Sequence, residues 1–239
     1  MPDKAWELLR AGDIDSGLNI MSKRYQDKPT ASTALELGNG YLFVGQYKSA
    51  WRHLDHFNKQ DKRPASIIFS MAGVAKWCSD RPLEAISEWR AGTEAEYQDW
   101  AGGIECPLLL FFASNSKHHP FREIATEADR LLQARVTKQH HIKHWPGPLA
   151  EYVLDQIDEA ELRRRCYVDG ESEAILYDRQ CDFYVAVRAR AAGDNVKSVE
   201  LFKKIADISS SDLQGENFFL GCMWQPEFFL ARYEIANVT

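Results

Sequence analysis

The sequence predicts an all-α fold built from antiparallel helix pairs, and three observations support that prediction. Two stretches, 37–54 and 72–89, place small and large apolar residues in the same order, with Gly38 and Gly73 thirty-five residues apart. A period of about 34 residues with small residues at fixed places is typical of a helix-turn-helix repeat. Apolar residues elsewhere recur at spacings of three and four, as on one face of a helix. No alternating pattern flanks a hairpin turn, so strands are not expected.

The first part of the chain divides into three expected helix pairs. These are 4–11 with 15–27, 32–44 with 47–59, and 66–79 with 82–92. Pro29 and Pro64 follow the first two pairs, and proline cannot continue a helix. Pro82 suits the first turn of its helix. Gly38 and Ala50 are expected where two antiparallel helices cross, because larger side chains there would push the helices apart.

The rest of the chain is expected to be helical but less regular. Gly102 and Gly103 predict a bend, and the apolar run 107–115 predicts a buried helix, with a strand as the alternative. The W-P-G-P run at 145–148 predicts a break. The further expected helices are 121–135, 149–156, 159–168, 180–192, 195–208 and 225–236, the last as a capping helix.

The chain has 239 residues, with 45% hydrophobic and 27% charged residues, which is ordinary for a folded domain with one continuous core. We therefore expect a single domain. Its expected parts are regular repeats at about 4–97, an irregular helical middle at 98–178, and a last repeat with its cap at 179–239.

The charge of the chain is negative and unevenly placed. The net charge is -6, and segment 151–182 alone holds ten acids and four bases. Nucleic-acid binding is disfavoured, because phosphate contacts need a basic surface. The acidic segment has two interpretations, a surface for a basic protein partner or a solvated helical face. The short run Arg163–Arg165 is expected to pair with nearby acids.

Targeting and redox signals favour a cytoplasmic protein. The N-terminus lacks the apolar run of a signal peptide, and no stretch approaches the length of a membrane span, so no membrane association is expected. Scattered cysteines in odd number favour reduced, mostly buried thiols over disulfides. They are Cys78, Cys106, Cys166, Cys181 and Cys222.

The sequence carries none of the common catalytic or phosphate-binding motifs, so no enzyme activity, cofactor or metal is expected. Histidines gather in two loops, at 118–119 and at 140, 141 and 144. His140 and His144 would share a face of a helix and could hold one metal ion, but Trp145-Pro146 ends any helix there. A polar surface loop is the competing interpretation, and a metal- or thiol-dependent enzyme remains the alternative from another functional class.

Residues 32–64 match a known repeat pattern best, through Leu37, Gly38, Tyr41, Gly45, Tyr47, Ala50 and Leu54. The stretches 66–97 and 180–208 match it in part, through Gly73, Ala85 and Trp89 and through Ala186, Gly193-Asp194 and Phe202. This pattern resembles the tetratricopeptide repeat (TPR) family. The resemblance implies a solenoid of antiparallel hairpins with a right-handed superhelix, and protein binding on the concave face lined by the first helix of each pair.

That resemblance implies a set of partner-binding residues. On the first helices of two repeats they are Asn39, Leu42, Phe43, Ser70, Val74 and Trp77. The acidic segment adds Asp155, Asp158 and Glu159. Family members that clamp a C-terminal carboxylate need a lysine where this chain has Leu35, which disfavours that ligand. Core packing is the competing interpretation for the large apolar residues.

In size and plan the chain is also similar to bacterial repeat proteins that act as immunity proteins of polymorphic toxin systems. The functional hypothesis is therefore a non-catalytic immunity protein that binds and neutralises a toxin, such as a basic nuclease. A general adaptor or assembly factor is the alternative within protein binding.

Overall fold

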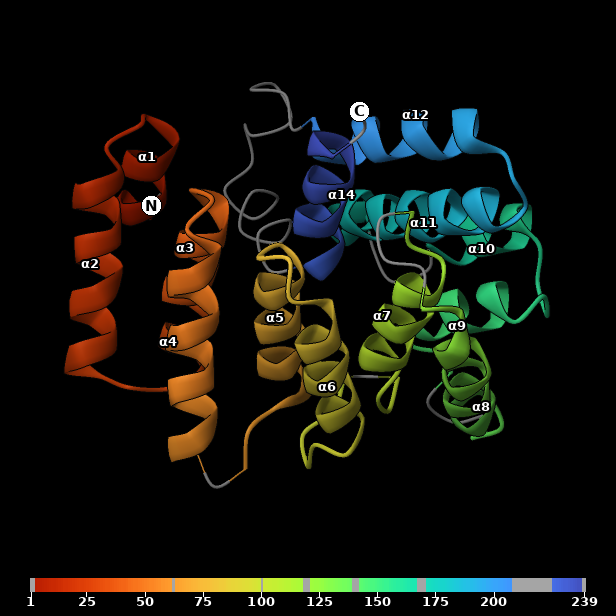
Figure 1. The fold of residues 1–239 in the computed structure, drawn as a ribbon, viewed down its shortest axis with the longest axis horizontal. Helices are drawn as coiled ribbons and strands as arrows, with labels where there is room; N and C mark the ends of the chain where they lie inside the picture. Colours follow the sequence, from red (N-terminus) through yellow and green to blue (C-terminus); the bar gives the residue numbers. More distant parts are fainter. Residues whose placement is uncertain are drawn as a thin grey trace.

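The all-α class is confirmed by the computed structural model (Figure 1). It describes residues 3–61, 63–99, 101–117, 121–138, 142–166, 171–207 and 225–237, without the side chains of 171–175. Within these ranges every regular element is a helix, and the one β-type contact is an isolated bridge between Ala65 and Tyr97.

Consecutive helices pack side by side along most of the chain. The first six are α1 (Lys4–Arg10), α2 (Ile14–Asp27), α3 (Ala31–Phe43), α4 (Tyr47–Gln60), α5 (Ser66–Trp77) and α6 (Pro82–Thr93). The middle holds α7 (Glu105–Ser114), the 3-10 helix η1 (Arg122–Ile124), α8 (Ala125–Val136), α9 (Gly147–Val153) and α10 (Glu159–Cys166). The last three are α11 (Glu171–Ala191), α12 (Asn195–Ala206) and α14 (Pro226–Ala236).

Three elements refine the expectations from sequence. The apolar run 107–115 is helical, so the strand alternative is wrong. Helix α9 begins inside the W-P-G-P run, after a cis bond between Trp145 and Pro146. It can include Pro148 because proline is tolerated in the first turn of a helix. Helix α11 is 21 residues long and begins at Glu171 rather than near 180. Its charged first half shows no apolar period that would have revealed it.

Five helix pairs share one turn, in which the turn residue has a positive φ. In α9–α10 that residue is Asp155, with φ of 60°. The turns of the other four pairs, α1–α2, α3–α4, α5–α6 and α11–α12, explain the spacing seen in the sequence. In α3–α4, for example, Gly45 N–H donates to Leu42 O (3.0 Å) and Gln46 N–H to Tyr41 O (2.8 Å), which is the Schellman arrangement. The four turn residues are Gly12, Gly45, Asp80 and Gly193, with φ of 86°, 75°, 56° and 86°. Aspartate can take the left-handed conformation, so the pair with Asp80 keeps the turn without glycine.

The same four pairs share a packing register. A small residue lies seven positions before each turn residue, and a large residue lies nine positions after it. Both residues are buried in every pair. The small and large partners are Ala5 with Met21, Gly38 with Leu54, Gly73 with Trp89, and Ala186 with Phe202. A Cβ atom at Gly38 would lie 2.8 Å from Leu54 Cδ2, and one at Gly73 would lie 2.2 Å from Trp89 Nε1. The expected close helix crossing at Gly38 is therefore confirmed.

We predict that Gly73→Ala lowers the free energy of unfolding by about 1–3 kcal/mol, because the added methyl group overpacks a fixed partner. Trp89 is fully buried and donates a 3.1 Å hydrogen bond to Ser70 O, so its ring cannot move aside cheaply. Gly38→Ala is the matched variant and should cost less, because only the end of the flexible Leu54 side chain must shift. Urea unfolding measures both variants, and an equal or larger loss for Gly38→Ala would contradict the proposed packing.

A second prediction concerns pH. His53 on α4 is half-buried, with its ring 4.6 Å from that of Tyr25 and a ring nitrogen 3.2 Å from Ala34 O. Burial lowers the pKa of His53 to about 4, whereas the unfolded chain has a histidine pKa of about 6.5. The unfolded state therefore binds the proton more readily, and stability falls as the pH drops from about 6.5 toward 4.

Between pH 7 and pH 4.5, the His53→Gln variant should lose about 1–3 kcal/mol less free energy of unfolding than the wild type. The measurement is the free energy of urea unfolding at pH 7 and at pH 4.5, with the exposed His56→Gln as the control. If wild type and His53→Gln lose the same stability between the two pH values, the neutral buried imidazole is not the cause.

Candidate functional site

The structure places the partner-binding residues implied on α5 in the interior. Ser70, Val74 and Trp77 are all 0% exposed. Helix α7 covers them, since Ser70 Oγ lies 3.3 Å from Cys106 Sγ and the Trp77 ring lies 5.3 Å from the Phe112 ring. As the chain is folded, these side chains pack in the core and cannot touch a partner.

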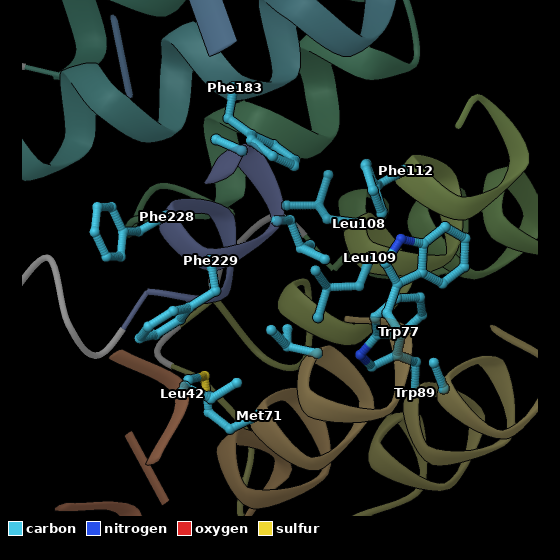
Figure 2. Packing of buried hydrophobic residues seen from close by; sticks show 14 of the residues in the cluster. Leu42, Met71, Trp77, Trp89, Leu108, Leu109, Phe112, Phe183, Phe228 and Phe229 are labelled. Atoms are coloured by element: carbon cyan, nitrogen blue, oxygen red, sulfur yellow. The ribbon is translucent and has the colours of Figure 1, made fainter. Parts of the chain in front are cut away.

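The residues implied on α3 are buried or half-buried, and two of them lie beside the C-terminal helix. Asn39 and Leu42 are buried, and Figure 2 shows the Phe229 ring of α14 directed toward Leu42. Phe43 is half-buried, with the Arg232 guanidinium of α14 at 5.8 Å from its ring centroid. The inner face expected to bind a partner is thus occupied by the chain itself, which corresponds to the core-packing interpretation.

The three acids expected to bind a partner lie together in one open cleft of about 540 Å³. It is formed where the α9–α10 turn faces the α11–α12 turn. The lining residues are Tyr152, Asp155, Gln156, Ile157, Asp158, Glu159, Val185, Arg188, Ala189, Ala192, Asp194 and Lys197. We call this the turn cleft.

Each of the three acids already has a partner within the protein. Asp155 pairs with Arg188, and Asp158 Oδ1 caps α10 by accepting a 2.8 Å hydrogen bond from Glu161 N–H. Glu159 lies 3.0 Å from Arg163 and 2.9 Å from Lys197. Burial opposes ionisation of Glu159, but these two cations outweigh it and lower its pKa.

The arginine run pairs with nearby acids, as expected from sequence. Arg163 lies 2.7 Å from Asp178 and 2.8 Å from the buried Asp182, and Arg165 lies 2.6 Å from Glu151. Arg164 binds Glu161, as Arg165 also does, and Lys204 binds Asp178 and Asp182.

Folding therefore balances the charge of the acidic segment. Seven acids of segment 151–182 have described side chains. The segment itself has four bases, and Arg188, Lys197 and Lys204 from outside it pair with its acids, which gives seven bases for seven acids. Asp169, Glu171 and Glu173 fall outside the described side chains. The turn cleft offers both signs of charge with an excess of acids, since four acids and two bases line it. Arg188 and Lys197 were missed, because they follow their acids by 33 and 38 residues.

Only some of the thiols and histidines considered for catalysis lie in the described part of the chain. Cys78, Cys106, Cys166 and Cys181 are buried thiols outside any disulfide, as expected, and Cys222 lies outside the described residues. Burial raises the pKa of the Cys78 and Cys106 thiols, which keeps them protonated and unreactive. His118, His119, His140 and His141 also lie outside the described residues, whereas His144 is exposed. In the described part of the chain, no three potential metal ligands cluster.

Comparison of the chain with family models, with curated proteins and with solved structures finds no match. None of the helices described is both long and apolar enough to cross a bilayer. The interpretation of the site therefore depends on its own geometry.

Proposed function

We propose that this chain is a non-catalytic protein-binding solenoid of TPR-like helical hairpins, and that the turn cleft is part of its partner surface. The observation that supports the proposal is the repeated hairpin, in which one Schellman turn and one small-to-large packing register recur four times. Stacked hairpins of this kind present long surfaces that suit macromolecular partners.

The chemistry of the turn cleft favours a partner with mixed charge. The Asp155 side chain is 75% exposed and beside it Arg188 is 29% exposed, so both can exchange their mutual pairing for contacts across an interface. Tyr152, Ile157 and Val185 add apolar wall between these charges. Complementary charges at such a surface set the orientation and the rate of encounter, while apolar packing prolongs the complex.

The more specific proposal is that the chain acts in the cytoplasm as an immunity protein whose partner is a toxin domain. It rests on the similarity of plan to bacterial immunity proteins. The lining of the turn cleft holds four acids and two bases, which suits a partner with an excess of basic groups, such as a nuclease domain, and with some acids to meet Arg188 and Lys197. Protection of cells that express a toxin encoded beside this chain tests the proposal, and a chain that protects against no such toxin would be an adaptor instead.

We predict that Ala192→Trp abolishes capture of the partner, because the indole would fill the turn cleft from an exposed position in its wall. The test is affinity purification from the source cells, followed by mass spectrometry and a binding assay with the purified partner. Ala11→Trp is the matched control, since Ala11 precedes the turn residue Gly12 as Ala192 precedes Gly193 and is also exposed.

Melting curves first establish that both variants fold. The proposal expects a stoichiometric partner with wild type and Ala11→Trp and none with Ala192→Trp. Equal capture by all three would exclude the turn cleft, and no stoichiometric partner for wild type would contradict protein binding itself.

A further inference from the structure

A second cavity, of about 510 Å³, lies between the end of α7, η1 and the end of α11. It shares no residue with the turn cleft. Its lining residues are Ser114, Asn115, Ser116, Lys117, Arg122, Ala125, Arg190 and Ala191. Three of them are cations and none is an acid, which distinguishes this cavity from the mixed charge of the turn cleft. We call it the basic pocket.

One of the three cations is held rigidly. The Arg190 side chain is only 9% exposed, and its Nη1 donates to Oε2 of Glu234 on α14 at 2.7 Å. The guanidinium also lies 4.7 Å from the centroid of the Phe202 ring. Glu234 is fully buried and accepts a second hydrogen bond, from Ser116 Oγ at 3.2 Å. Arg190 is thus a pre-positioned donor, and in the described part of the chain only its Nη1 has a hydrogen-bond acceptor, which leaves the other N–H groups for a ligand.

The other two cations pair with no carboxylate in the part of the chain described. Lys117 and Arg122 are exposed, and no ion pair with a described carboxylate involves either of them. They are not needed to cap α7, because Phe112 O accepts the Asn115 N–H and Ala113 O accepts the N–H of Ser116. The Schellman turn at Gly193 satisfies the end of α11 in the same way.

The wall of the pocket is fixed by short polar side chains. Ser114 Oγ donates to Phe111 O at 2.8 Å, and Asn115 Nδ2 donates to Phe111 O and Ser114 Oγ, both at 2.9 Å. The cations therefore project from a wall that is already ordered, which reduces the entropy cost of binding a ligand. Among the described side chains of the lining and the Glu234 that Arg190 binds, three cations stand against one carboxylate, a formal charge of plus two.

We propose that the basic pocket binds a phosphate-type dianion, with Arg190 as the fixed donor and Lys117 and Arg122 closing over the anion. A phosphate monoester carries a charge of about -1.5 to -2 at pH 7 and three acceptor oxygens, which matches the charge and the donors of the pocket. Charge-assisted hydrogen bonds from guanidinium groups to such oxygens are short and strong. This inference does not depend on the proposed protein-binding function.

The test titrates inorganic phosphate and, separately, O-phosphoserine into the full chain at constant ionic strength, followed by NMR chemical shifts. Acetate, a monoanion, is the comparison ligand. The pocket variant is Lys117→Gln with Arg122→Gln, which leaves the buried Arg190–Glu234 pair intact. The matched control is Lys23→Gln with Lys48→Gln, which removes the same charge from exposed positions outside the pocket.

We expect saturable binding of phosphate, with shifts at residues 114–117, 122–125 and 190–191, and weaker binding of acetate. The pocket variant should bind at least about tenfold more weakly, whereas the control variant should bind like wild type. Tighter binding of O-phosphoserine than of phosphate would identify a phosphorylated side chain as the source of the group, and the reverse order a free anion. Absence of saturation, or an equal loss of affinity in the control variant, would overturn the proposal.

Discussion

The buried carboxylates of α14 are the constraint on which the rest of the structure depends. Glu234 is fully buried and binds Arg190 of α11, and Glu227 accepts hydrogen bonds of 3.0 and 3.1 Å from two further side chains of α11. Tyr233 of the same helix donates a 2.6 Å hydrogen bond to Asp80 in the α5–α6 turn. Helix α14 therefore joins the early hairpins to the last one, as its position in Figure 1 shows.

This attachment determines which surfaces can have a function. Removing one partner of a buried ion pair costs about 3–5 kcal/mol, because the other charge is left unpaired, so α14 is not expected to leave its place readily. While it stays, Leu42 remains covered, and the inner face is closed to partners. In the described part of the chain, the turn cleft and the basic pocket are among the cavities that stay open, and both lie at helix ends. Arg190 links the anchoring of α14 to the basic pocket, since it pairs with Glu234 and also lines that pocket.

The local parts of this fold could be predicted from sequence, because they repeat. Gly38 and Gly73 mark close helix crossings in the sequence, and the structure shows why each must be small. The placement of α14 could not be predicted, because Tyr233 and its partner Asp80 are 153 residues apart and no periodic pattern joins them. The candidate site was predicted in part, since its acids were found while Arg188, which pairs with one of them, was not.

Amide hydrogen exchange of α14, compared with α5 and α11, tests the central claim most directly. If α14 is an anchored part of the core, its amides should exchange only through the same large opening that exposes α5 and α11, with similar protection. The Arg190→Met variant, which removes the Arg190–Glu234 ion pair, should then lower the protection of all three helices together. Fast exchange of α14 in the wild-type protein, while α5 and α11 stay protected, would show a detachable helix and would contradict the account.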